Sequence, residues 1–297
     1  MLSWIKDQVK PVVFNNPLLF RLFLRMKFRV EQQLIADQPV MTSEHSSIIH
    51  FSLNKAATQH TKNVLSRVSK MNGIKPVHIN EYAFFTEFPY LTSVPPGSMS
   101  DYAHIFRPKG FLYSAFGGMV HGIKDLEQYK VILMIRDPRD ILVSWYYSLA
   151  FSHSIPPQTS NRHQEYLENR RKARGITVDE HVLQESERVF TILDTYRNEL
   201  LEPYSHVVLT SYEEMTSDYS AWLHKLLKAC DLEIPPIVFQ QLLEENRQLQ
   251  PDEEDKHQHI RKGKPGDYLD KLKPETIDKL NKKFELIFQA YQDVLKF

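Results

Sequence analysis

Short apolar runs recur along the chain and are typical of strands that are buried on both faces of a sheet. They cover residues 47–53, 77–80, 111–116, 130–135 and 206–209. Segments with the apolar spacing of helices separate them and cover 61–71, 140–150, 177–201 and 218–230, with a last helix from about Pro274. Thr177 and Glu180 predict a capping box. The alternation predicts an α/β fold with a mainly parallel central sheet flanked by helices.

The stretch Pro17–Val30 is the most hydrophobic of the chain, although basic residues interrupt it. Arg21, Arg25 and Arg29 follow one another at every fourth residue and form one stripe on a helix. We favour a helix that packs on the main domain with solvated arginines; a helix on a membrane surface is the alternative. The pattern divides the chain into an N-terminal helical segment, 1–40, and one domain, 41–297.

Polar residues fill 152–175 and 248–267, which we expect to be mobile loops. The 297 residues are 42% hydrophobic and 25% charged, which excludes collagen-like and fully disordered chains. Basic and acidic residues number 37 each, so we expect no nucleic-acid partner. The single cysteine, Cys230, excludes an intrachain disulfide framework and lies on the apolar face of its helix, as an inert core residue would. It fits a reducing compartment, and we expect a cytoplasmic protein.

The turn between the first strand and the first helix, residues 53–60, is a candidate anion site. Small side chains at Ala56 and Ala57 let backbone N–H groups approach an oxygen, and Lys55 adds a positive charge to that of the helix N-terminus. The turn is not a Walker A loop, because GxxxxGK[ST] is absent. Taken alone, it is equally consistent with a helix capped by Thr58 or Thr61 beside a solvated lysine.

Arg136 ends a buried strand, and Ser144 lies on the first turns of the following helix. The two could hold one anion from two sides, because a guanidinium and a hydroxyl both donate hydrogen bonds. The alternative is a surface charge network of Asp137, Arg139 and Asp140.

A third candidate segment is 260–268, where the three cations Arg261, Lys262 and Lys264 lie close to two glycines. The glycines free the backbone, so the loop could close over a polyanion. Taken alone, it is more simply a solvated basic loop beside the acidic run 252–255.

In order and context, the three segments resemble the sulfotransferases that use 3′-phosphoadenosine-5′-phosphosulfate (PAPS). In that family a PKSGTTW-type turn binds the 5′-phosphosulfate, an RdPkDvavSyy-type motif binds the 3′-phosphate, and an RKGxxGDW-type loop closes over the nucleotide. The corresponding segments here are Asn54–His60, Arg136–Tyr147 and Arg261–Tyr268, and Tyr212–Met215 resembles the family's YEDM segment. The resemblance covers about 47–268 and implies the P-loop-NTPase-like, three-layer sulfotransferase fold.

The resemblance implies transfer of a sulfuryl group from PAPS to a hydroxyl or amine, with release of PAP and no metal. The acceptor stays open among carbohydrates, lipids and small molecules, as does the oligomeric state. Lys55 is the implied catalytic lysine, which would neutralise charge on the leaving 5′-phosphate. The implied nucleotide-binding residues are Lys55, Ala56, Ala57, Thr58, Gln59, His60, Arg136, Ser144, Tyr212, Arg261, Lys262 and Gly263.

The chain departs from the family at the catalytic base. Cytosolic members carry a histidine after the third strand, but the matching position falls near Ser114, where there is none. Carbohydrate- and protein-directed members use a carboxylate after the first helix, and Glu81 is similarly placed. Glu81 is therefore our preferred general base, with His121 and His104 as alternatives; each could also be an ordinary hydrogen-bonding residue. Two other functions stay open: a P-loop-like nucleotide phosphotransferase and a PAP-binding module without activity.

Overall fold

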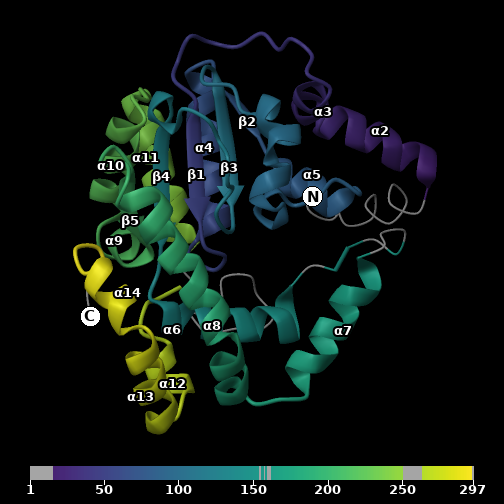
Figure 1. Cartoon of the computed structure of the whole chain (residues 1–297). Coiled ribbons are helices and arrows are strands. Elements are labelled where there is room, and N and C mark those ends of the chain that lie inside the picture. The colour runs from purple at the N-terminus through teal and green to yellow at the C-terminus, as the bar shows by residue number, and fades with distance from the viewer. Residues whose placement is uncertain (1–15, 154, 157, 159–161, 250–262, 296–297) are drawn as a thin grey trace.

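Five parallel strands form a central sheet with the order β2-β3-β1-β4-β5 (Figure 1). They are β1 (Ile48–Ser52), β2 (Lys75–Val77), β3 (Phe111–Phe116), β4 (Lys130–Ile135) and β5 (Val208–Ser211). The computed structural model describes residues 16–153, 155–156, 158, 162–249 and 263–295. Because Ile48 and Ile49 of β1 belong to apolar clusters on opposite faces, the sheet is buried on both sides, and the predicted α/β fold is confirmed.

Helices cover both faces of this sheet (Figure 1). One apolar cluster joins the sheet to α4 (Thr58–Met71), α9 (Tyr212–Ser217), α10 (Tyr219–Ala229) and α11 (Pro236–Gln248). The other joins it to α5 (Ile79–Phe85), α6 (Pro138–Tyr147), α8 (Val178–Tyr196), α13 (Pro274–Lys283) and α14 (Glu285–Ala290). Four further short elements are η1 (Leu91–Ser93), η2 (Pro96–Ile105), η3 (Leu126–Gln128) and α12 (Tyr268–Lys271).

Several local predictions are confirmed. Thr177 Oγ1 accepts a hydrogen bond from the Glu180 backbone N–H (3.2 Å), and Glu180 Oε2 accepts one from the Thr177 N–H (2.7 Å), which is the predicted capping box. Cys230 is fully buried in the apolar cluster with α10, as expected of a core residue. The predicted strands at 111–116 and 130–135 coincide with β3 and β4.

Three predicted elements are wrong in part. The strand expected at 77–80 is the edge strand β2, two residues earlier; the His78 N–H binds Glu31 Oε1 (2.7 Å) instead of a neighbouring strand, and α5 follows. The polar segment 152–175 contains a helix, α7 (His163–Arg174), after the π-helical turn η4 (Ser148–Ser152). Of the residues of α7 only Ala173 is buried, so the pattern shows no apolar stripe. The helix expected at 177–201 ends at Tyr196 and continues as the π-helical turn η5 (Arg197–Leu201).

The N-terminal helix is present as α2 (Pro17–Lys27) and is followed by α3 (Arg29–Ile35). Phe23 contacts Phe85 of α5 with ring centroids 5.9 Å apart, and Phe28 is buried against Tyr82. The end of α2 and Phe28 thus lie against α5, and α3 contacts η2 and β2 at the edge of the sheet (Figure 1). In the described ranges, no helix combines the length and the apolar character that crossing a bilayer requires.

Candidate functional site

The turn after β1 is tight and positions the start of α4. Lys55 and Ala57 have positive φ angles (79° and 55°), which are uncommon for residues other than glycine and concentrate at functional sites. The Thr58 hydroxyl donates to the Leu53 carbonyl (3.2 Å) and lies 2.9 Å from Ser52 Oγ. These buried contacts stabilise the turn. As a result α4 begins at Thr58, three residues before the predicted start, and its first N–H groups border Lys55.

Lys55 contacts Ser148 and Arg136, which is the first residue of the segment Arg136–Tyr147. Its Nζ donates to Ser148 Oγ (2.6 Å), and its carbonyl oxygen accepts from Nη1 of Arg136 (3.1 Å). Burial, and then the charge of Arg136, lower the pKa of the Lys55 ammonium to about 8. Two cations that are 81 residues apart in the sequence are thus joined at the carboxyl ends of neighbouring strands, β1 and β4.

Arg136 is held at this place by aromatic and acidic neighbours. Its guanidinium lies 4.1 Å above the centroid of the Tyr212 ring, and its Nη2 donates to Asp140 Oδ2 (3.2 Å). Its Nε is buried and has no hydrogen-bond partner among the described residues. A buried guanidinium N–H without a partner is rare, so this donor suits an anionic ligand.

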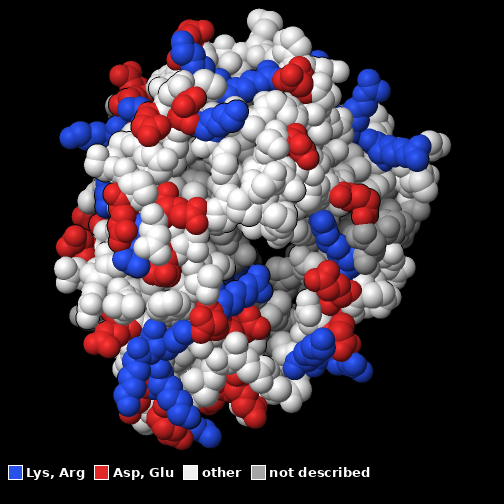
Figure 2. Space-filling view, viewed as in Figure 1, with Lys and Arg blue, Asp and Glu red and all other residues white. Residues whose placement is uncertain are grey.

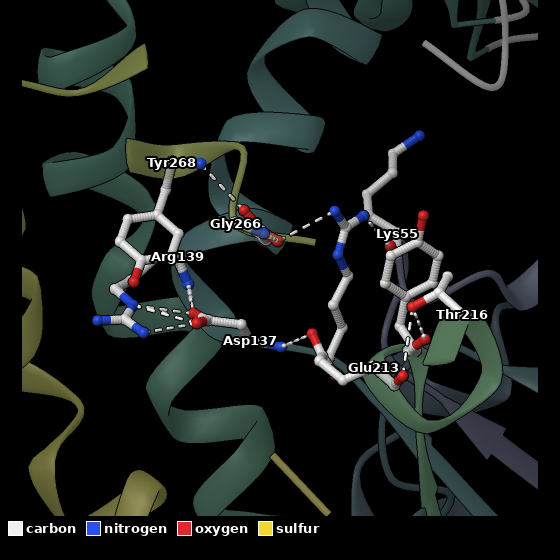
Figure 3. Close-up of polar contacts among 10 residues, drawn as sticks. Lys55, Asp137, Arg139, Glu213, Thr216, Gly266 and Tyr268 are labelled. Carbon is white, nitrogen blue, oxygen red and sulfur yellow. Dashed lines mark hydrogen bonds and ion pairs between the residues drawn. The ribbon is translucent and has the colours of Figure 1, made fainter. Parts of the chain in front are cut away.

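Asp140 joins this arginine to the C-terminal loop, of which Gly266 and Tyr268 are labelled in Figure 3. Its side chain is fully buried: Oδ2 also accepts from the Gly266 N–H (2.8 Å), and Oδ1 accepts from the Tyr268 N–H (3.0 Å). Arg139 binds Asp137 (2.6 Å) and lies 4.0 Å above the Tyr268 ring. Asp137, Arg139 and Asp140 are all buried, so the alternative of a surface charge network is wrong.

A second buried carboxylate, Glu213, lies beside Asp137 (Figure 3). Its Oε1 accepts from the Asp137 N–H (3.1 Å), while its Oε2 has no partner among the described residues. Burial raises the pKa of Glu213 to about 7 against the lowering effect of that hydrogen bond and of Arg136.

The other predicted nucleotide-binding residues vary in placement. Ala56 is buried in the turn and Gln59 is exposed on α4. His60 Nε2 lies 3.0 Å from the Tyr219 hydroxyl, and its ring is near Trp222, so it belongs to an aromatic group at the start of α4 and α10. Ser144 is half-buried on α6, one turn beyond Asp140. Gly263 is half-buried with φ 70°, whereas Arg261 and Lys262 lie outside the described residues.

Glu81, the preferred base, is held between two lysines. Its Oε1 binds Lys27 of α2 (2.5 Å) and its Oε2 binds Lys62 of α4 (3.2 Å). Burial opposes ionisation, but the charges and hydrogen bonds of Lys62 and Lys27 outweigh it and lower the pKa of Glu81. The side chain is therefore a carboxylate at neutral pH, as a general base must be.

The two alternative bases have other partners. His121 Nδ1 lies 2.8 Å from Glu199 Oε2, and His104 is exposed with its Nε2 3.1 Å from the Ile35 carbonyl. None of these contacts involves Lys55 or Arg136.

Sequence reasoning missed Ser148 and His153. Ser148 accepts from Lys55, and His153 Nδ1 lies 3.4 Å from Ser148 Oγ while its ring stacks on Tyr166 of α7. Both lie in or beside the π-helical turn η4, which no apolar pattern marks. The lysine partners of Glu81 were missed too, because they are 54 and 19 residues away in the sequence.

A family model described as "Sulfotransferase domain" matches residues 123–294, more than half of the chain. The chain belongs to the sulfotransferase family. The match includes Arg136, Ser144 and Gly263 but begins after Lys55 and Glu81, whose roles it does not address.

No curated protein sequence matches the chain. Among solved structures, the chain is similar to mouse sulfotransferase SULT7A1 complexed with PAP, at 16% identity over 89% of this chain and 88% of that one, with a TM-score of 0.49. It is also similar to retinol dehydratase in a complex with retinol and PAP, at 13% identity over 91% and 88%, with a TM-score of 0.48. Membership of the family rests on the sequence match, and the fold on the sheet and its helices.

Proposed function

We propose that this sulfotransferase takes a sulfuryl group from PAPS, transfers it to a hydroxyl or amine of an acceptor, and releases PAP. One observation carries the proposal: Arg136 donates to the carbonyl of Lys55 (3.1 Å) and keeps a buried Nε without a partner among the described residues. A lysine and an arginine from separate motifs thereby form one cationic site, which suits a ligand with a phosphate at each end of a nucleoside.

In this proposal, Arg136 and the residues around it bind the 3′-phosphate. Asp140 and Tyr212 fix the guanidinium, and Ser144 lies one turn beyond Asp140 on α6. Arg261, Lys262 and Gly263 stay predicted partners of the same phosphate; the contacts of the Gly266 and Tyr268 backbone with Asp140 support this prediction. Recognition at this position distinguishes PAP from nucleotides that carry only 5′-phosphates.

Lys55 acts on the other side of the nucleotide. The sulfur–oxygen bond to the 5′-phosphate breaks while a bond to the acceptor oxygen or nitrogen forms in line with it. The Lys55 ammonium and the first N–H groups of α4 stabilise the negative charge that grows on the departing phosphate oxygen. The acceptor gives its proton to Glu81.

A PAP-binding module without activity is the competing function, and the contacts of Glu81 favour it. Both carboxylate oxygens are bound to ammonium groups (2.5 and 3.2 Å), which stabilise the ionised form and lower the pKa of Glu81. A carboxylate with a lowered pKa is a weaker proton acceptor, which matters for transfer and not for nucleotide binding.

Release of PAP from PAPS, measured with pools of carbohydrate, lipid and small-molecule acceptors, tests the proposal. We expect acceptor-dependent PAP release by the wild type and its loss in Lys55→Ala. Nucleotide binding without transfer to any pool would support the inactive module, and transfer from ATP in place of PAPS would support the phosphotransferase.

A further inference from the structure

The outer face of α2 exposes a row of apolar side chains. Leu18, Leu22 and Met26 are four residues apart and are 75%, 54% and 74% exposed. Leu19, beside them, is 40% exposed. Isolated exposed apolar residues are ordinary, but a contiguous group marks an interaction surface. We give the name α2 face to Leu18, Leu19, Leu22 and Met26 together with Arg21 and Arg25 of α2 and Arg29 at the start of α3.

Arginines form the neighbouring row. Arg21, Arg25 and Arg29 are exposed, and none of them has an acidic partner within the described ranges. The inner side of the same helix differs: there Lys27 is paired with Glu81, and Phe23 and Phe28 pack inward. Figure 2 shows Lys and Arg side chains projecting at the edge of the molecule where Figure 1 places α2 and α3. Basic charge is therefore neutralised on the inner side and left unpaired on the outer one.

We propose that the α2 face docks on the surface of an anionic lipid bilayer. A helix of 11 residues is too short to span the hydrocarbon, so it would lie in the plane of the interface. Its leucines and Met26 would then enter the headgroup boundary while the arginine row meets lipid phosphates. The chain has equal numbers of basic and acidic residues, so attraction to such a surface comes from this face and not from overall charge.

Docking stands independently of the proposed chemistry, but it would add to it. Lys27 on the inner side of α2 contacts Glu81, so the bilayer would lie about one helix diameter, roughly 10 Å, from the proposed base. An acceptor presented at the bilayer surface would then be within reach of the site. This last step rests on the proposed function.

Co-sedimentation of the full chain with vesicles tests the docking. We expect binding to vesicles that contain phosphatidylserine, and weaker binding to pure phosphatidylcholine and at high salt. Arg21→Gln/Arg25→Gln should weaken binding about 25-fold, because each arginine near an anionic surface contributes about 1 kcal/mol, or about fivefold. Leu22→Ser/Met26→Ser should also weaken it, since less apolar surface is buried. These positions are exposed, so unchanged melting temperatures should confirm that the variants fold.

The matched control is Arg171→Gln/Lys172→Gln on α7, which removes the same charge from side chains that are 80% and 70% exposed. It should bind vesicles as the wild type does. If the control and the α2 variants lost vesicle binding equally, the proposal would be wrong. It would also be wrong if the wild type bound vesicles equally well with and without phosphatidylserine. If Leu22→Ser/Met26→Ser instead dissociates a dimer while no vesicle is bound, the face is a self-association surface and lipid docking is wrong.

Discussion

The two halves of the candidate site are built differently. Around Arg136, the acidic and aromatic partners are buried, and Asp140 closes the group by hydrogen bonds to Arg136, Gly266 and Tyr268. Around Glu81, the carboxylate is 30% exposed and is held by long lysine side chains from α2 and α4. The contacts of the first half are buried, whereas those of the second rest on two long lysine side chains, 37% and 13% exposed.

Because of this difference, we expect substitutions around Arg136 to change nucleotide affinity and substitutions at Lys55 or Glu81 to change the rate of transfer. Changes around Arg136 should alter how tightly a nucleotide is held, because the groups there are fixed before it arrives. Changes at Lys55 or Glu81 should alter the rate, because their charges matter most in the transition state. Each of the following predictions tests that division.

The largest effect is expected for Lys55→Ala. Removal of a charge that faces the developing negative charge should lower kcat about 10³-fold, by analogy with the loss of one oxyanion-stabilising group. The PAP dissociation constant should change far less. Single-turnover transfer and calorimetric titration with PAP measure the two separately. If PAP affinity and kcat fell equally, Lys55 would act in ground-state binding, and the separation between residues that set affinity and residues that set rate would be wrong.

Glu81→Gln should lower kcat about 10²-fold, because it removes the proton acceptor but keeps the shape of the side chain. His121→Gln and His104→Gln are the matched comparisons, since their contacts lie with Glu199 and the Ile35 carbonyl. A large loss in either histidine variant, with Glu81→Gln near wild type, would move the base to that histidine.

Sequence patterns predicted the surroundings of Arg136 far better than those of Glu81. Arg136 directly follows the apolar strand β4 and begins a segment of fixed spacing, so local pattern and neighbouring contacts coincide. Lys27 and Lys62 reach Glu81 from distant helices, and nothing in the spacing of either predicts the contact. The same holds in the fold: β3 and β4 were predicted to the residue, whereas α7, with one buried residue, gave no apolar signal.

Asp140→Asn should weaken PAP binding about thirtyfold while leaving ADP binding nearly unchanged. Hydrogen bonds to a charged group contribute about 2 kcal/mol, and the change weakens those that orient Arg136 and the C-terminal loop. Asp179→Asn is the control: Asp179 accepts from the Lys273 N–H (3.0 Å), so it also anchors the C-terminal segment but does not touch Arg136. If both variants lose PAP affinity equally, Asp140 stabilises the segment only.

The smallest expected effect is in the pH dependence of kcat/KM. The pKa of Lys55 is lowered to about 8 by burial and by Arg136, so its protonated form declines as the pH rises through 8. If protonated Lys55 is the active form, kcat/KM should fall about tenfold between about pH 7 and 9. Glu213, with a pKa of about 7, titrates nearby, so the profile is best recorded in Glu213→Gln. Lys55→Arg should lose the inflection, because arginine stays protonated; an unchanged profile would contradict the assignment.

Calorimetric titration with PAP and with ADP tests the central claim most directly, on wild type, Arg136→Ala and the exposed control Arg67→Ala, whose guanidinium binds Glu245. The account predicts that the wild type and Arg67→Ala bind PAP much more tightly than ADP, and that Arg136→Ala loses this preference. A wild type that binds both nucleotides equally, or an Arg136→Ala variant that keeps the preference, would contradict a 3′-phosphate site at Arg136.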